Sequence, residues 1–265
     1  MALRSPDLNV MIKAAEAASK SLLRDFGEVE QLQVSRKGPA DFVSAADRRA
    51  EQILHRELSK ARPSYSFLME ESGAIKGEDP ENIFIIDPLD GTTNFLHGIP
   101  QWCISIALER KGEIVAGLIY DPVQDEMFTA EKGTGAFMRN RRMRVSGRTK
   151  LEGALVMGGS PVSARSWHKR YMGQLSQVLD TDISFRRMGS AALDLAYVAC
   201  GRADAFWEEG LNAWDVAAGA LIVKEAGGTI VSTDKSETDP VRSGALIASN
   251  THIHPLIEKL VDYKA

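Results

Sequence analysis

The stretch FIIDPLDGTTNF, Phe84–Phe95, carries two carboxylates at the end of an apolar segment. Four apolar residues precede Asp87, as in a buried strand, and the proline that follows stops regular ladder hydrogen bonding. Gly91 allows a tight turn, which brings Asp90 round toward the strand end. Thr92 follows at a predicted helix start, where free N–H groups can bind an anion. The stretch therefore predicts a buried strand that delivers a pair of acids to a turn.

Two carboxylates this close in a partly buried turn repel each other, and each raises the pKa of the other unless a cation lies between them. The stretch offers oxygen donors and no His or Cys, a donor set that favours a hard ion such as Mg²⁺ over zinc. The backbone carbonyl of Leu89, between the two acids, is a further candidate ligand. The stretch thus predicts a magnesium site.

Other acids stand at predicted strand ends or helix starts. Glu70 and Glu71 follow the strand-like segment YSFLM, and we expect Glu71 to face solvent or to support Glu70. Asp47 and Asp215 are each predicted in the first turn of a helix, where an acid complements the helix dipole. This explanation suffices for Asp47. It is less satisfactory for Asp215, the sole charge within AWDVAAGALIV.

Length and composition limit the class of protein. The chain has 265 residues, enough for one large α/β unit or two closely packed ones. A net charge of −4 gives no basic footprint for nucleic acid. The sequence contains no apolar run of about 18 residues, so no membrane span is predicted. The first ten residues lack the apolar core of a signal peptide. We expect a cytoplasmic protein with Cys103 and Cys200 as buried free thiols.

The first half, residues 1–150, predicts two helices followed by a largely antiparallel sheet. The first helix begins near the N-terminus and is expected to stop at Gly27. The second is expected to begin at Ser44, with Asp47 completing a capping box. These elements give an α+β arrangement.

The second half, residues 151–265, alternates predicted strands and helices, which indicates a β/α layer packed on the first half as one unit. Its last helix is expected to extend to Tyr263. Within the first half, a β-hairpin is expected to turn at Lys111-Gly112. The basic segment Arg139–Arg148 is expected to be a solvated loop.

Three blocks together carry a resemblance to a known family. The segments EES (70–72), DPLDGTTNF (87–95) and WDVAAGALIVKEAGG (214–228), in this order, resemble the signature blocks of the inositol monophosphatase family. The likeness runs from about Lys37 to Asn250, and its central block is the most specific. The sequence departs from the family at Met69, where glycine commonly precedes EES, and MGGSPV matches too poorly for contact residues to be assigned.

The resemblance implies a Mg²⁺-dependent, lithium-sensitive phosphatase with a five-layered αβαβα fold. The implied ligands of the first metal are Glu70, Asp87 and the Leu89 carbonyl. The implied ligands of the second metal are Asp87, Asp90 and Asp215. Asp47 corresponds to an outer acid linked to a weaker third site.

The resemblance also implies roles in catalysis and substrate binding. Glu70 and Thr92 correspond to the pair that orients and deprotonates the attacking water, and the amides of Gly91 and Thr92 to a phosphate cradle. Glu208 corresponds to the acid that binds an inositol hydroxyl. The substrate-contacting set implied by the resemblance is Leu89, Asp90, Gly91, Thr92, Arg186, Gly189, Ala191, Glu208 and Asp215.

The substrate class leaves alternatives open. Inositol 1-phosphate is the substrate that the resemblance implies, and Glu208 supports a polyol because a carboxylate accepts hydrogen bonds from hydroxyls. Fructose 1,6-bisphosphate, histidinol phosphate and 3′-phosphonucleotides remain alternatives. A haloacid-dehalogenase type of phosphatase is disfavoured. In that class the two acids of the motif are two positions apart, whereas in DPLD the two aspartates are three positions apart.

A role of another class is also open. Family members are commonly homodimers, and some bacterial relatives act as binding partners of the transcription machinery. The segment Arg139–Arg148 or the pair Arg186-Arg187 could carry such a contact. None of the four implied acidic ligands is substituted, which favours an enzyme.

Overall fold

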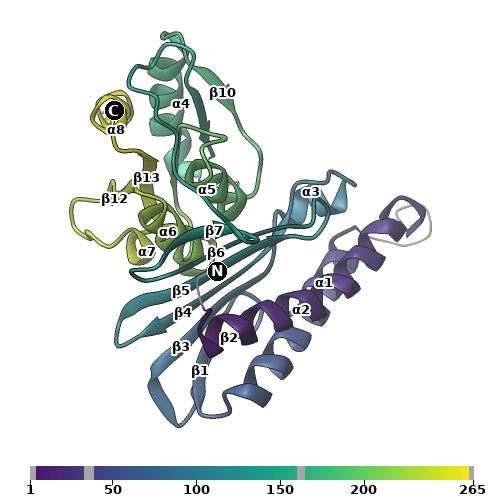
Figure 1. Ribbon diagram of the computed structural model, residues 1–265. Coiled ribbons are helices and arrows are strands. Elements are labelled where there is room, and N and C mark those ends of the chain that lie inside the picture. Colours follow the sequence, from purple (N-terminus) through teal and green to yellow (C-terminus); the bar gives the residue numbers. More distant parts are fainter. Residues whose placement is uncertain (1–3, 33–38, 160–164, 263–265) are drawn as a thin grey trace.

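The computed structural model describes residues 4–32, 39–159 and 165–262 (Figure 1). The helices are α1 (Pro6–Leu32), α2 (Pro39–Ala61), α3 (Thr92–Leu96), α4 (Arg165–Leu179), α5 (Ala191–Ala199), α6 (Ala213–Glu225), α7 (Pro240–Ser243) and α8 (His254–Val261). The strands are β1 (Tyr65–Met69), β2 (Gly73–Ile75), β3 (Asp79–Asp90), β4 (Cys103–Arg110), β5 (Glu113–Asp121), β6 (Glu126–Glu131), β7 (Gly135–Met138), β8 (Arg141–Arg142), β9 (Leu155–Gly158), β10 (Ser184–Arg186), β11 (Ala205–Glu209), β12 (Gly228–Ser232) and β13 (Ala245–Asn250).

Helices and sheets alternate in five layers (Figure 1). The pair α1 and α2 covers the outer face of the first sheet, and α5 and α6 lie between the two sheets. Helices α4 and α8 cover the outer face of the second sheet. The predicted αβαβα fold is confirmed.

The first sheet has the strand order β2-β1-β3-β4-β5-β6-β7-β8. Strands β1 and β3 are parallel, and the other neighbouring pairs are antiparallel, as predicted. The β4–β5 hairpin turns at Lys111 and Gly112, whose φ values of 54° and 79° suit the tight turn that the sequence predicts.

Strand β3 is buried on both faces, which explains its unbroken apolar run. Phe84 and Ile86 pack in the core under α1 and α2, whereas Ile85 packs in the core around α5 and α6. The chain therefore reaches Asp87 from a strand that has no solvent-facing side at its end.

The second sheet has the order β10-β9-β11-β13-β12, with β9, β10 and β11 parallel and β13 antiparallel to both of its neighbours. The predicted alternation of strands and helices in residues 151–265 is confirmed. Strand β11 separates two cores, because Phe206 packs toward α5 and α6 and Trp207 packs toward α4 and α8.

Two predicted helix boundaries are wrong. Helix α1 runs past Gly27 to Leu32, because an exposed glycine costs a helix only about 1 kcal/mol and does not end it. Helix α2 begins at Pro39, a residue suited to a first helical turn, so positions 44 and 47 lie inside the helix and not at its start. Tyr263, the predicted end of the last helix, lies outside the described residues.

Strand β8 lies within the segment predicted as a solvated loop. Arg141 and Arg142 pair with β7 at the edge of the first sheet, and both are exposed. Charged side chains on an edge strand disfavour pairing with another chain. Strand β2 and helix α7 were also not predicted from the sequence, because both are very short.

Two properties of the described chain bear on its class. No helix in the described ranges has both the length and the apolar character needed to cross a membrane. Cys103 and Cys200 are free thiols, the first fully buried and the second half-buried.

Candidate active site

The end of β3 changes direction at the quoted motif. Its pairing with β4 shifts register between Asp87 and Asp90. Gly91 has a φ of 96°, and a Cβ there would lie 2.8 Å from the carbonyl oxygen of Gln101. A side chain is excluded at this turn, so glycine is required where the sequence indicates a tight bend.

Three carboxylates meet at this turn. One oxygen from each of Asp87, Asp90 and Asp215 lies within 4.8 Å of the other two. Asp215 is in the first turn of α6, where its Oδ2 accepts a 2.7 Å hydrogen bond from the N–H of Asn212. Its side chain therefore caps the helix and faces the other two acids at the same time.

Glu70 follows the last residue of β1, the parallel neighbour of β3. Its backbone N–H donates to the carbonyl of Ile86 at 3.2 Å. The carboxyl of Asp87 is within hydrogen-bond reach of the Glu70 carboxylate. The predicted ligands from β1, β3 and α6 thus come together at one end of the first sheet.

Burial and mutual repulsion raise the pKa of each of these acids. The pKa of Asp87 lies well above its ordinary value because of burial first, then repulsion from Glu70 and Asp90. The pKa of Asp215 is raised to about 7 by burial and by Asp90. Such a set becomes fully ionised when a cation offsets the repulsion. Its all-oxygen chemistry fits a hard ion such as Mg²⁺.

The motif is also held by hydrogen bonds of its own. The N–H of Leu89 donates to Asp87 Oδ1 at 2.9 Å, and the hydroxyl of Thr92 donates to the carbonyl of Leu89 at 3.0 Å. A carbonyl oxygen has two lone pairs, so Leu89 keeps one for a further partner.

Asp47 lies on α2 at the outer side of the group. It is 3% exposed, and among the described residues its Oδ1 has no hydrogen-bond partner. Burial, followed by repulsion from Glu71 and Glu70, raises the pKa of Asp47 to about 8. It is no first-turn acid, so the dipole explanation does not apply to it.

Glu51, one helical turn beyond Asp47, is a buried acid that the sequence interpretation missed. Its Oε2 accepts a 2.9 Å hydrogen bond from the N–H of Glu71, and its Oε1 accepts one of 2.5 Å from the hydroxyl of Ser72. The four-residue spacing from Asp47 was the available signal, since it places both acids on one helix face.

The predicted substrate-contacting residues of the second half fall into two groups. Gly189, with a φ of 86°, and Ala191, the first residue of α5, lie beside the acids. The pKa of Glu208 on β11 is raised to about 8 by burial and then by Asp90, so its carboxylate also faces the group. Arg186 is exposed at the end of β10, where its guanidinium donates to the carbonyl of Phe185 at 2.8 Å.

The sequence interpretation also missed Ser190 and Asn94, because their hydrogen-bond partners are distant in sequence. Asp90 Oδ2 accepts hydrogen bonds from the hydroxyl of Ser190 at 2.6 Å and from the N–H of Ala192 at 2.8 Å. Asn94 donates to the carbonyl of Met188 at 2.9 Å. No local pattern reports such contacts.

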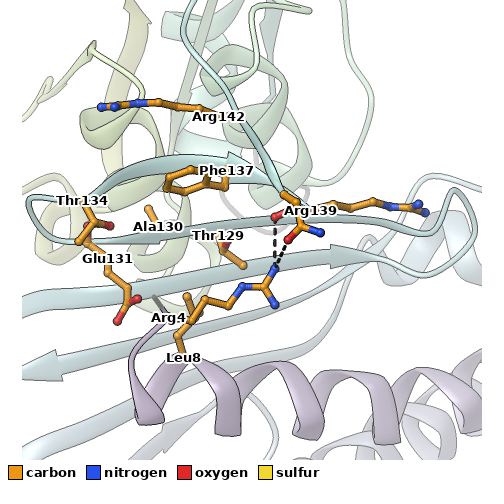
Figure 2. Close-up of a pocket in the computed structure, with 10 residues that line it drawn as sticks. Arg4, Leu8, Thr129, Ala130, Glu131, Thr134, Phe137, Arg139 and Arg142 are labelled. Carbon is orange, nitrogen blue, oxygen red and sulfur yellow. Dashed lines mark hydrogen bonds between the residues drawn. The ribbon is translucent and has the colours of Figure 1, made fainter. Parts of the chain in front are cut away.

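Figure 2 shows a different cavity, of about 230 Å³, between the start of α1 and strands β6 to β8. Arg4 spans it and donates to the Arg139 carbonyl and to Asn140 Oδ1. None of its lining residues is a predicted site residue. This cavity is therefore separate from the acid cluster.

The fold and the acid cluster are those of a metal-dependent phosphatase superfamily with a layered αβαβα architecture. The inositol monophosphatase family model matches residues 3–265, and the chain belongs to this family. The family predicted from the three sequence blocks is confirmed, and with it the class of enzyme, a phosphatase.

Curated relatives are similar over nearly the whole chain. An inositol-1-monophosphatase of Mesorhizobium japonicum is 55% identical over 258 residues, which cover 97% of each chain. A Nus factor SuhB of Pseudomonas aeruginosa is 43% identical over 250 residues, covering 93% of this chain and 92% of that protein.

A solved structure agrees with the fold. The crystal structure of the extragenic suppressor protein suhB from Bartonella henselae has a TM-score of 0.90 and 53% identity, and the match covers 98% of this chain and 100% of the other.

Proposed function

We propose that this chain is a Mg²⁺-dependent inositol-1-monophosphatase, which converts myo-inositol 1-phosphate and water to myo-inositol and phosphate. The observation that carries the proposal is the convergence of Asp87, Asp90 and Asp215, with Glu70 at the end of the neighbouring strand, where its backbone N–H donates to the carbonyl of Ile86. The name of the 55% identical relative from Mesorhizobium japonicum supports the substrate.

The residues that would hold two Mg²⁺ ions are Glu70, Asp87, the Leu89 carbonyl, Asp90 and Asp215. Asp47, with its unpartnered oxygen, would serve a weaker third ion. Bound Mg²⁺ supplies neutralisation of the phosphate dianion and a lowered pKa for the attacking water.

The protein's own groups would orient the water and take its proton. The hydroxyl of Thr92 donates to Leu89, so its oxygen keeps lone pairs that can accept a hydrogen bond from a water. Glu70 lies at the exposed side of the group, where its carboxylate can accept the proton of a water. The amides of Gly91 and Thr92 would bind the phosphate.

The polyol would be bound by the second half of the chain. Glu208 faces Asp90 across the site and can accept hydrogen bonds from substrate hydroxyls. Gly189 and Ala191 would contact the substrate through their backbone. Arg186 is the outermost member of the proposed set, because it lies at the exposed end of β10.

A second role, contact with a protein of the transcription machinery, is favoured by two observations. Relatives with about two fifths identity are named Nus factor, and Arg141, Arg142 and Arg144 form an exposed basic run near the β8 edge. We place this role beside catalysis, in a homodimeric cytoplasmic protein.

The proposed function is tested by phosphate release from a substrate panel. The panel holds inositol 1-phosphate, fructose 1,6-bisphosphate, histidinol phosphate and 3′-phosphoadenosine 5′-phosphate, each with Mg²⁺, with EDTA, and with Mg²⁺ plus Li⁺. We expect fast, EDTA-sensitive and lithium-inhibited release from inositol 1-phosphate. Preference for another compound would change the substrate and keep the reaction. Absence of release from all four would overturn the proposal.

A further inference from the structure

The turn that carries Asp90 is hydrogen-bonded to a segment 100 to 102 residues further along the chain. Ser190 is 1% exposed, and its hydroxyl donates to Asp90 Oδ2 at 2.6 Å. The N–H of Ala192 donates to the same oxygen at 2.8 Å. Two donors converging on one oxygen fix the orientation of this carboxylate.

A second link joins the same two segments, and here the donor belongs to the turn. The side-chain amide of Asn94 donates to the carbonyl of Gln101 at 2.8 Å and to the carbonyl of Met188 at 2.9 Å. Gly189, next in the chain, has a φ of 86°, and a Cβ there would lie 3.0 Å from Asn94 Nδ2. The two segments approach so closely at this point that a side chain would have to displace Asn94.

We infer that Asn94 and Ser190 are positioning residues, and that their side chains form a clasp between the Asp90–Asn94 turn and the Met188–Ala192 segment. The inference rests on the proposed function, in which the turn binds Mg²⁺ and the segment contacts substrate. Mg²⁺ and the phosphate product tighten each other's binding by equal factors, and part of this coupling passes through the clasp, because it fixes Asp90 and the substrate-contacting segment relative to each other.

A purely structural role for Ser190 makes a different prediction. Its hydroxyl also accepts from the N–H of Leu193 at 3.4 Å and so caps α5. Ser5 caps α1 in the same way, accepting from the N–H of Leu8 at 3.1 Å, and it has no link to the acids. Ser5→Ala is therefore the matched control for the loss of a serine cap.

The test measures Mg²⁺ binding by calorimetry, with and without inorganic phosphate, on full-length protein without substrate. We expect Ser190→Ala and Asn94→Ala to weaken Mg²⁺ binding about tenfold and to reduce its enhancement by phosphate, while Ser190→Thr restores both. Ser5→Ala is expected to bind Mg²⁺ like the wild type. Circular dichroism in EDTA identifies variants that fail to fold, and Asn94→Ser then replaces a failed variant.

Wild-type Mg²⁺ affinity and undiminished phosphate coupling in the folded Ser190 and Asn94 variants would overturn the clasp. A loss of affinity in Ser5→Ala equal to that in Ser190→Ala would overturn it too, because general loss of stability would then explain the effect. A wild-type chain that is silent on the phosphatase panel, yet loses Mg²⁺ affinity on Ser190→Ala, would overturn the proposed function and support the clasp.

Discussion

The carboxylate of Glu51, buried in α2, accepts a 2.9 Å hydrogen bond from the backbone N–H of Glu71. Its second oxygen accepts from Ser72, and on the other side the N–H of Glu70 donates to the carbonyl of Ile86. The turn that presents Glu70 is therefore held between a helix and a strand. Its position depends on a buried acid outside the set predicted to bind metal.

We expect Glu51→Gln to lower kcat about tenfold or more. The amide offers one acceptor oxygen in place of two, so one donor of the turn loses its partner at a cost of about 1–3 kcal/mol. A displaced Glu70 would then misplace the attacking water. Steady-state kinetics at saturating Mg²⁺ provide the measurement. Glu57→Gln is the control, because Glu57 is on the same helix and pairs with exposed Arg56. Equal kcat in the two variants would contradict the prediction.

Asp90→Asn is expected to reduce turnover at least about a thousandfold, because a negatively charged ligand is lost and the Mg²⁺ that would neutralise the phosphate is held less tightly. The amide oxygen can still accept from Ser190 and Ala192, so the circular dichroism spectrum should be unchanged. Phosphate release from inositol 1-phosphate is the readout. Near-normal activity would exclude Asp90 from the two-metal arrangement.

Asp47→Asn is expected to stabilise the metal-free protein at pH 8. Because the folded-state pKa of Asp47 is about 8 and its ordinary value is 3.8, the folded state holds a proton that the unfolded state releases between these pH values. The free energy of unfolding therefore falls as the pH rises through this window. Removing the titration should add about 5 kcal/mol at pH 8 and only about 1 kcal/mol at pH 4.5. Urea unfolding in EDTA at both pH values measures the difference.

Asp25→Asn, on the neighbouring helix α1, is expected to have the opposite effect on stability. Asp25 is 4% exposed, but its carboxylate accepts from Arg49 at 2.6 Å. Its neutralisation leaves a guanidinium poorly paired, so the variant should be less stable than the wild type at pH 8. A decrease in both variants would show that Asp47 has a stabilising partner.

Local chemistry in the sequence predicted the centre of the site. An apolar run ending in an acid, a proline, a second acid and a glycine specified both the β3 strand and its turn. The meeting of Asp215 with Asp87 depends on how α6 packs between the sheets, and spacing along the chain carries no such information. Only the family resemblance supplied it.

The supporting residues could not be predicted for the same reason. Ser190 and Asn94 each bind atoms of a segment distant in sequence, which no local pattern reports, and Glu51 was marked only by its four-residue spacing from Asp47. Asp47 was misassigned because Ser44 and Asp47 have the spacing of a capping box while Pro39 begins the helix earlier. The capping-box spacing was present, but the helix starts at the upstream proline instead.

The misplaced helix end at Gly27 leads to the last prediction, which concerns stability. Gly27 is an exposed residue inside α1, and a Cβ there would have no neighbour within 4 Å. Gly27→Ala should therefore stabilise the protein by about 0.5–1 kcal/mol, because alanine loses less backbone entropy in a helix. Gly117→Ala should instead cost about 1–3 kcal/mol, since its Cβ would lie 2.8 Å from the carbonyl oxygen of Ala218 on α6. Thermal melting of both variants decides the matter: a lower melting temperature for Gly27→Ala would mean that α1 does end where the sequence first suggested.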